Sequence, residues 1–336
     1  ILQIASPRPV PPRWREFEVT YRIALADGPA PKRPWIPLPQ DARDYQRALS
    51  ATWQGNASAA RIYHDADYGA PILFAEWHDA AVKPALEVVA RVATQDRTVD
   101  PTRRRRDNVS AAERQFYLRP TASMPTDGIV RETAQRITSA SVSQTDKARA
   151  IYEWVVENTF RDPKTKGCGI GDIKYMLESG NLSGKCADLN ALYTGLARAA
   201  GLPAREVYGI RVADGAEFKS LGKSGDITKA QHCRAEVLID GVGWFPVDPA
   251  DVRKVVLEEP LPIDDPRTRA VRRRLFGAWE MNWVAFNTAR DFRLEGQSGD
   301  GIGFFMYPYA EAGQTVLDHL DPAAFRYQIE ARELTA

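Results

Sequence analysis

The chain has 336 residues, with 45 Lys and Arg against 44 Asp and Glu, which gives a formal net charge of +1. This near balance argues against a bulk nucleic-acid-binding protein, and 44% hydrophobic residues argue against intrinsic disorder. No apolar run approaches the roughly 20 residues of a membrane-spanning helix, so we expect no membrane span. The length allows two domains, or one domain with a substantial extension.

The first residues are typical of a processed precursor. The chain starts at Ile1 rather than at Met, and residues 1–6 read as the remainder of a removed leader or as an arbitrary boundary. The proline-rich residues 7–12 predict an extended linker. We therefore expect an exported protein, periplasmic or extracellular, whose leader lies outside this sequence.

A strand-rich region follows. Apolar and polar residues alternate over 17–25, which predicts a strand with one buried face. The prolines of residues 31–39 favour an extended edge strand around Trp35. Further strands are expected at 60–63, 72–77 and 86–94. Short strands broken by Gly, Pro and Asp predict an antiparallel β-sandwich, which we assign to residues 1–115.

The pattern then becomes helical and leads to a cysteine. Apolar spacing predicts helices around residues 129–137 and 148–156, followed by the glycine-rich turn 167–171. Residues 186–199 carry apolar side chains at helical spacing, with Cys186 in the first turn and Gly201 as the stop signal. A thiol at a helix N-terminus is favoured as thiolate. A lone cysteine is more often a small core residue than a nucleophile. Cys186 is therefore a candidate nucleophile only if the rest of the chain supplies a base and an orienting acid.

Two strands after Pro203 supply the partners that a nucleophilic cysteine needs. Residues 205–212 and 231–239 read as strands, and the turn Asp240-Gly241 predicts a hairpin into a return strand over 243–249. This hairpin pairs the strand carrying His232 with the strand ending at Asp248, so the carboxylate can reach the imidazole. Cys186, His232 and Asp248 then have the roles of nucleophile, base and orienting acid.

An acyl-transfer site also needs donors for the developing oxyanion. The backbone N–H of Cys186 would supply one, because the acyl oxygen forms beside it. Tyr175 and Gln231 are candidates for the second donor, on their position in the chain alone. No cluster of His, Cys, Asp or Glu has metal-ligand spacing, and neither His64 nor His78 has such a neighbour, so we expect no metal and no organic cofactor.

Three sequence blocks carry a family resemblance. They are G-K-C-A-D-L-N-A-L-Y-T-G-L-A-R-A-A-G-L-P-A-R, then Q-H-C-R-A-E-V, then G-W-F-P-V-D-P, in order within about residues 130–258. Together they resemble the transglutaminase-like superfamily of papain-related cysteine enzymes. The resemblance implies nucleophile Cys186, base His232 and acid Asp248, an accessory N-terminal β-sandwich as in bacterial members, and frequent export. Arg234 stands where the family often has an aromatic residue, which leaves the acyl-acceptor side open.

The expected fold is therefore α+β, an N-terminal antiparallel β-sandwich followed by a papain-like, transglutaminase-like core. We place the core at residues 116–258 and a C-terminal β-rich extension, packed on the core, at 259–336. Residues 267–274 read as part of a connection. The aromatic residues between 304 and 309 read as packing against the core, with a substrate groove as the alternative.

The expected function is cysteine-dependent acyl transfer on peptide or amide bonds of a protein or peptide substrate, with cell-envelope material as one possibility. Water as acceptor gives a peptidase or amidase, which we favour, and an amine gives a transglutaminase. A non-catalytic envelope-binding module on the same fold is the alternative from another class. Three cysteines fit one reactive thiol plus either two free thiols or one bridge, which would join Cys168 and Cys233, and a Cys168–Cys186 redox pair is a weaker hypothesis.

Overall fold

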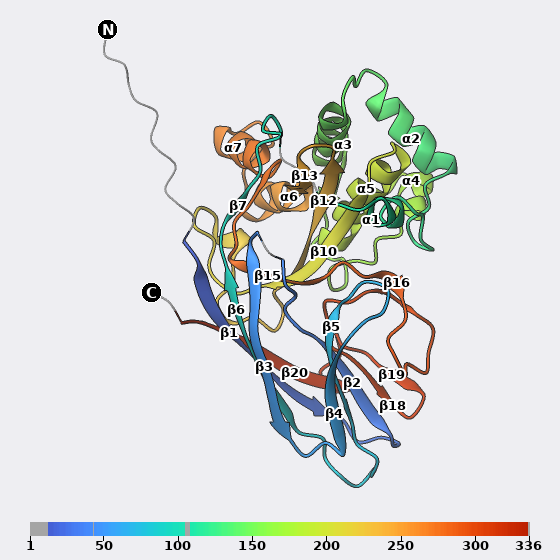
Figure 1. Cartoon of the computed structure of the whole chain (residues 1–336), viewed down its shortest axis with the longest axis vertical. Helices are drawn as coiled ribbons and strands as arrows, with labels where there is room; N and C mark the ends of the chain where they lie inside the picture. Colours follow the sequence, from blue (N-terminus) through green and yellow to red (C-terminus); the bar gives the residue numbers. More distant parts are fainter. Residues whose placement is uncertain (1–12, 43, 105–107, 335–336) are drawn as a thin grey trace.

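The computed structural model describes residues 13–42, 44–104 and 108–334. It has a layer of two packed β-sheets and a layer of helices that covers a third sheet (Figure 1). The fold is α+β, as expected. The expected leader remnant and proline-rich linker, residues 1–12, lie outside the described residues. No helix in the described ranges is long and apolar enough to cross a membrane.

The first sheet of the sandwich has the strand order β11-β20-β1-β6-β3. Alternate residues of β1 are buried, which is the period-two pattern expected for residues 17–25. β3 was not predicted, because nearly all of its side chains are exposed and no alternation marks it. The strands are β1 (Arg15–Leu25), β3 (Gln46–Gly55), β6 (Leu86–Thr94), β11 (Gly225–Asp226) and β20 (Phe325–Glu333).

The second sheet has the strand order β19-β18-β2-β5-β4. β2 lies between β18 and β5, so the expectation of an edge strand around Trp35 is wrong. That expectation rested on prolines, which cannot donate to a ladder, whereas the partner β18 comes from a distant part of the chain. The strands are β2 (Lys32–Pro37), β4 (Ala59–His64), β5 (Pro71–Glu76), β18 (Tyr309–Ala312) and β19 (Thr315–Leu317).

The inner faces of these two sheets form one core. Phe17 and Val19 of β1 belong to the same buried cluster as Ile36 of β2 and Leu73 of β5. The cluster continues through Cys186 at the start of a helix in the other layer. The sandwich and the helical layer therefore share packing rather than meeting only at loops.

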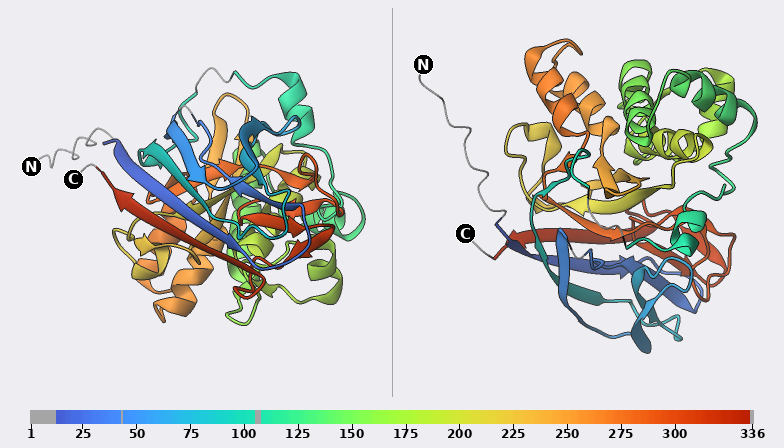
Figure 2. Two further views of the ribbon diagram at one scale, coloured as in Figure 1. Left: turned by 90° about the horizontal axis from the view of Figure 1, so that it is seen from below. Right: turned by 45° about the horizontal axis from the view of Figure 1, so that its top comes forward.

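The C-terminal segment differs from the expected extension on the core. β20 pairs with β1 over nine residues, from Phe17↔Glu333 to Leu25↔Phe325, and β18 and β19 belong to the second sandwich sheet. The first and last strands of the chain lie side by side (Figures 1 and 2). The strand pairing therefore departs from the division into residues 1–115, 116–258 and 259–336, because both ends of the chain build the sandwich.

The third sheet has the order β13-β12-β10-β15 and carries the helices on one face (Figure 2). Every residue of helix α5 (Cys186–Ala199) except the last is buried, so α5 is the central helix of this layer. It packs on β12 and against α2 and α3. The strands are β10 (Ala204–Arg211), β12 (Gln231–Ile239), β13 (Gly243–Val247) and β15 (Trp283–Asn287).

The other helices surround α5. The helices α2 and α3 confirm the helical pattern of residues 129–156. α7 replaces the connection expected at residues 267–274, because Asp265 caps its N-terminus and Pro266 begins its first turn. The remaining helices are α1 (Ala111–Phe116), α2 (Gly128–Thr138), α3 (Gln144–Asn158), α4 (Ile173–Ser179), α6 (Pro249–Glu258), α7 (Pro266–Arg274) and the 3₁₀ turn η1 (Lys219–Leu221).

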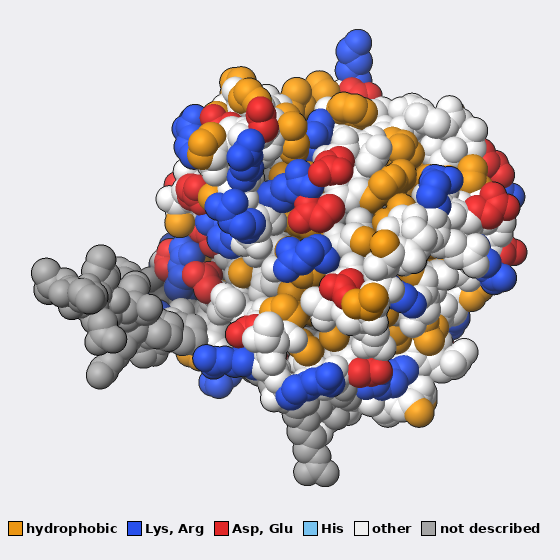
Figure 3. All heavy atoms as spheres, turned by 90° about the horizontal axis from the view of Figure 1, so that it is seen from above, with side chains coloured by type: hydrophobic (Ala, Val, Ile, Leu, Met, Phe, Trp, Pro, Cys, Tyr) orange, Lys and Arg blue, Asp and Glu red, His pale blue; other side chains and the backbone are white. Residues whose placement is uncertain are grey.

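Three short strand pairs join the layers and loops. β8 (Phe160–Arg161) pairs in parallel with β9 (Ser183–Gly184), immediately before α5. The other pairs are β7 (Arg97–Thr98) with β14 (Ala278–Trp279), and β16 (Arg290–Phe292) with β17 (Ile302–Phe304). The outer face of the helical layer mixes cationic, acidic and apolar side chains without large patches of one kind (Figure 3).

Candidate active site

Cys186 is the first residue of α5, and a network around Asp188 fixes that helix start. The Asp188 carboxylate accepts hydrogen bonds from the backbone N–H of Lys185 at 3.0 Å, of Ile170 at 3.0 Å and of Gly171 at 2.9 Å. A Cβ at Gly169 would lie 1.8 Å from this carboxylate, so the loop needs glycine there. The network therefore holds the loop containing Cys168 against the first turn of α5.

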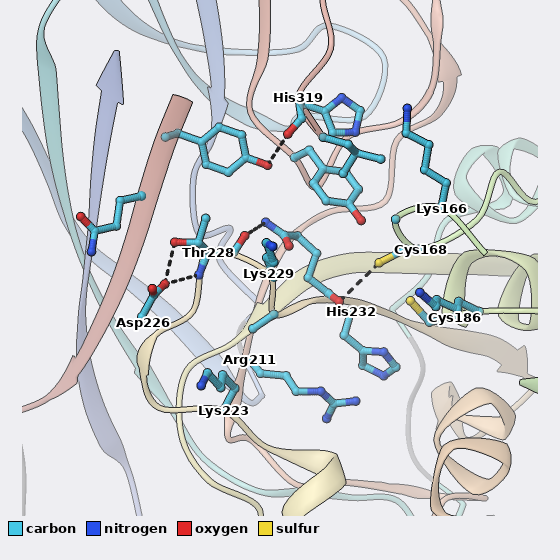
Figure 4. Close-up of a pocket in the computed structure, with 18 of the residues that line it drawn as sticks. Lys166, Cys168, Cys186, Arg211, Lys223, Asp226, Thr228, Lys229, His232 and His319 are labelled. Atoms are coloured by element: carbon cyan, nitrogen blue, oxygen red, sulfur yellow. Dashed lines mark hydrogen bonds between the residues drawn. The ribbon is translucent and has the colours of Figure 1, made fainter. Parts of the chain in front are cut away.

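His232 lies on β12, and Asp248 directly follows the neighbouring strand β13, which ends at Val247 rather than at the expected residue 249. His232 Nε2 is 2.8 Å from Asp248 Oδ2, and both side chains are buried. The other Asp248 oxygen, Oδ1, accepts from the backbone N–H of Asp251 at 3.1 Å, so Asp248 also caps helix α6. With Nε2 directed at the carboxylate, Nδ1 is the imidazole nitrogen left for Cys186, and His232 lowers the pKa of that thiol. The structure thus brings together Cys186, His232 and Asp248 (Figure 4).

A second carboxylate, which the sequence reasoning missed, also faces His232. Asp251 Oδ2 is 3.4 Å from His232 Nε2, and its Oδ1 accepts from Arg211 at 2.6 Å. Arg234 lies 3.6 Å from Asp248 and stacks 4.6 Å over the ring of Trp283. The site therefore contains a buried imidazole with two carboxylates and two guanidinium groups. The signal available in the sequence was the spacing of Asp251 three residues after a helix-capping aspartate.

The described residues contain one group of side chains that could hold a metal ion. Its possible ligand atoms, from His232, Asp248 and Asp251, lie within 4.8 Å of one another. Their surroundings do not fit a cation. Arg211 and Arg234 already supply positive charge to both carboxylates, and the imidazole nitrogen is hydrogen-bonded to Asp248. We assign these residues to orientation of His232 rather than to metal binding.

The electrostatics favour a thiolate at Cys186. The neighbouring thiols of Cys168 and Cys233 lower the pKa of Cys186 well below its ordinary value, and His232 acts in the same direction against the effect of burial. The neighbouring Cys186 and burial raise the pKa of Cys168, and burial followed by Cys186 raises that of Cys233. Among the three thiols, Cys186 is therefore the one whose pKa is lowered.

The imidazole is held in its charged form. Burial alone would lower the pKa of His232, but the charges of Asp251 and Asp248 outweigh burial and raise it. A thiolate and an imidazolium then stabilise each other. All three cysteines are free thiols, so of the two alternatives left by the sequence the structure has two further free thiols and not a Cys168–Cys233 bridge. The Cys168 thiol donates to the backbone carbonyl of Gln231 at 3.5 Å.

A pocket of about 1100 Å³ opens over Cys186 and His232 (Figure 4). One wall comes from the C-terminal segment, including Tyr307, His319 and Tyr327. Tyr307 stacks on His319 with ring centroids 4.4 Å apart, and its place in the pocket wall matches the substrate-groove alternative for these aromatic residues. Phe305 and Tyr309 do pack in a buried cluster, as expected. The aromatic segment is therefore divided between pocket wall and core.

The two candidate oxyanion donors lie in different places. Gln231 lines the pocket beside His232, and its Nε2 donates to the carbonyl of Thr228 at 3.1 Å. Tyr175 lies on α4 with 62% of its surface exposed, and it is not part of the pocket wall. The structure therefore brings Gln231, but not Tyr175, to the predicted nucleophile.

Comparisons with known proteins agree with this arrangement. The profile of the transglutaminase-like superfamily matches residues 131–249, which contain all three residues of the Cys–His–Asp set. An uncharacterized protein of Haemophilus influenzae is 39% identical over 337 residues, covering 95% of this chain and 91% of the relative. A solved structure described as a "putative cysteine protease" from Cytophaga hutchinsonii has the same fold, with a TM-score of 0.60 and 14% identity over 96% of this chain and 92% of that chain.

Proposed function

Because the chain belongs to the transglutaminase-like superfamily, we propose that it is a cysteine-dependent acyl-transfer enzyme that hydrolyses peptide-type amide bonds. The observation that carries this proposal is the buried thiol at the first turn of α5, which lines the same pocket as an imidazole whose Nε2 is 2.8 Å from Asp248. Such a set provides a nucleophile, a proton carrier and an orienting acid.

The reaction follows from these positions. The Cys186 thiolate attacks the amide carbonyl carbon, and the carbonyl oxygen becomes an oxyanion near the N–H groups at the start of α5. His232 gives its proton to the leaving amine, and the C–N bond breaks to leave a thioester on Cys186. His232 then takes a proton from water, which attacks the thioester and releases the carboxylic acid. Asp248 holds the imidazole in place through both steps.

The charge of the pocket supports water as the acceptor. A transglutaminase acceptor is a primary amine, which at neutral pH approaches as an ammonium ion. Lys166, Lys185, Lys223 and Lys229 line this pocket and would repel a second cation. We therefore favour a peptidase or amidase over a transglutaminase, and retain the non-catalytic binding module as the alternative that the first experiment must reject.

We also propose that the protein acts outside the cytoplasm, because the family that it resembles is frequently exported in bacteria. Fractionation of the native cells would test this location. Recovery of the protein with cytoplasmic markers would contradict it, without bearing on the chemistry at Cys186.

Alkylation of each cysteine as a function of pH, measured by mass spectrometry, tests the proposed chemistry. We expect Cys186 alone to react rapidly below about pH 7, well under the roughly 8.5 of an ordinary thiol. Replacing His232→Ala removes the imidazolium and should move the Cys186 profile to higher pH. Peptide amides, with and without added amines, then distinguish hydrolysis from transfer.

A Cys186 that titrates like an ordinary thiol, unaffected by His232→Ala, would contradict the enzymatic proposal. Survival of biological function in Cys186→Ala would then favour the binding module.

A further inference from the structure

The pocket over Cys186 is unusually cationic for a chain with almost balanced charge. Eight of its lining residues are Lys or Arg, and one is acidic, Asp226. The outer face of the helical layer, by contrast, intersperses both signs (Figure 3). The cationic lining residues are Arg161, Lys166, Lys185, Arg211, Lys223, Lys229, Lys254 and Arg326.

Four of these cations are already paired. Arg211 bonds Asp251 at 2.6 Å, Lys166 bonds Asp318 at 2.9 Å, and Arg161 bonds Glu258 at 2.8 Å. Lys254 is 3.8 Å from the same Glu258. These pairs account for half of the positive charge in the wall.

The other four cations, Lys185, Lys223, Lys229 and Arg326, have no carboxylate within 4.0 Å among the ranges that the structure describes. Asp226 offsets part of their charge. Hydrogen bonds from Thr228 lower the pKa of Asp226, with Lys223 and Lys229 acting in the same direction, so this carboxylate is ionised. An excess of positive charge therefore remains facing the cavity.

These four cations line the same pocket as the nucleophile and come from different parts of the chain. Lys185 directly precedes Cys186, and Lys223 and Lys229 lie on the segment that leads into β12 and His232. Arg326 comes from β20 on the sandwich side of the pocket. Figure 4 shows Lys223 and Lys229 near Asp226, and Lys166 above Cys168 on another side of the cavity. A ligand at Cys186 would thus have cations on more than one side.

A concave site lined mostly by charges of one sign concentrates the field and attracts anions, even where, as at Lys223, Lys229 and Arg326, the side chains themselves are exposed. The nucleophile acts on an amide carbonyl, so the anion must be part of a peptide. We propose that this pocket selects acidic peptides, with carboxylate side chains or a free C-terminal carboxylate close to the scissile amide. This inference rests on the proposed acyl-transfer function and names its substrate class.

Matched peptides test the inference directly. Two series of equal length, with Glu or isosteric Gln near the scissile amide, are compared for kcat/KM at low salt. We expect the Glu peptides to be cleaved at least about tenfold better, mainly through KM, because several cations each contribute about two- to fivefold. The preference should shrink in 1 M NaCl, where the screening length is about 3 Å.

Substitutions then assign the preference to named residues. Lys223→Gln and Lys229→Gln, made singly and together, should each lower kcat/KM for Glu peptides by about two- to fivefold, and should change that for Gln peptides less. The matched control for each single substitution is Lys83→Gln, which removes one charge from an exposed loop of the sandwich outside the pocket. Equal cleavage of both series, or equal effects of the double variant on both, would overturn the inference while leaving acyl transfer intact.

A binding measurement separates this inference from the catalytic proposal. Fluorescent Glu and Gln peptides are titrated into the Cys186→Ala protein, with and without the two Lys substitutions. Tighter binding of Glu peptides that depends on these lysines supports the inference even if the parent enzyme cleaves nothing. Binding of heparin as tight as that of the Glu peptides would overturn the assignment to a peptide.

Discussion

At the scale of single residues, Asp248 has two functions on its two oxygens. Oδ2 orients His232, and Oδ1 caps α6 through the N–H of Asp251. The same residue therefore fixes the imidazole and the helix that carries the second carboxylate. Asparagine and alanine substitutions separate these roles, because asparagine is also a good helix cap.

We expect Asp248→Asn to lower kcat by about 10²–10⁴-fold. A neutral amide does not stabilise the protonated imidazole of His232 and does not fix the tautomer of the neutral ring. The thermal unfolding temperature should change less than in Asp248→Ala, which also loses a cap worth about 1 kcal/mol. Steady-state kinetics and thermal unfolding of both variants measure the two effects. Parent-like kcat in Asp248→Asn would remove Asp248 from the catalytic set.

A second residue-scale prediction concerns the three-thiol cluster. Cys168→Ala removes a neighbouring thiol that lowers the pKa of Cys186, so this pKa should rise and the alkylation profile of Cys186 should move to higher pH. Cys168→Ser keeps a polar donor at this position and should leave the profile closer to the parent. A Cys168→Ala profile identical to that of the parent would show that Cys168 does not stabilise the thiolate.

At the scale of elements, the sequence was most informative where one face of an element is apolar. The helix at Cys186 and the strands at 86–94 and 231–239 occur within a residue of their expected bounds. Elements without that pattern were missed: β3 is largely exposed, and α7 is a basic helix whose cap, Asp265, was its main local signal.

The same distinction applies to the candidate site. Cys186, His232 and Asp248 could be predicted because they lie on one helix and one hairpin, whose geometry is local. Arg211 and Tyr307 could not be placed, because their contacts depend on how distant segments pack around that hairpin. Asp251 was missed for another reason: its helix α6 was not expected, so its orientation toward His232 had no basis in the sequence reasoning.

At the scale of the whole molecule, the sandwich and the site are one structure. β20 pairs with β1 in the sandwich and also carries Arg326 and Tyr327 to the pocket wall. These partners are separated by about the whole chain, and no local pattern indicates such pairing. The sandwich therefore contributes to the wall of the proposed substrate site. The long separation of β1 and β20 in the sequence is the reason why the C-terminal segment was not recognised as a strand of the sandwich.

A buried ion pair makes a second connection between the layers. Glu236 on β12 pairs with Arg97 on β7, which follows the sandwich strand β6, and with Arg205 on β10 at 2.7 Å. Burial alone would raise the pKa of Glu236, but Arg205 and Arg97 outweigh burial and lower it. The folded pKa is thus below the unfolded value, so this carboxylate stabilises the fold above the unfolded pKa, and the stabilisation is lost as pH falls through the folded pKa.

We therefore expect Glu236→Gln to destabilise the protein by about 3–5 kcal/mol at pH 7, because two buried guanidinium groups lose their carboxylate. The matched control Glu330→Gln breaks an exposed pair with Arg22 and should cost about 0–1 kcal/mol. Chemical denaturation of the parent and both variants from pH 7 to pH 3 measures this. The gap between parent and Glu236→Gln should narrow below about pH 4.5, as the parent carboxylate becomes protonated. A gap that stays constant with pH would mean that packing, rather than charge, makes Glu236 important, and the two layers would then be joined by their shared apolar core alone.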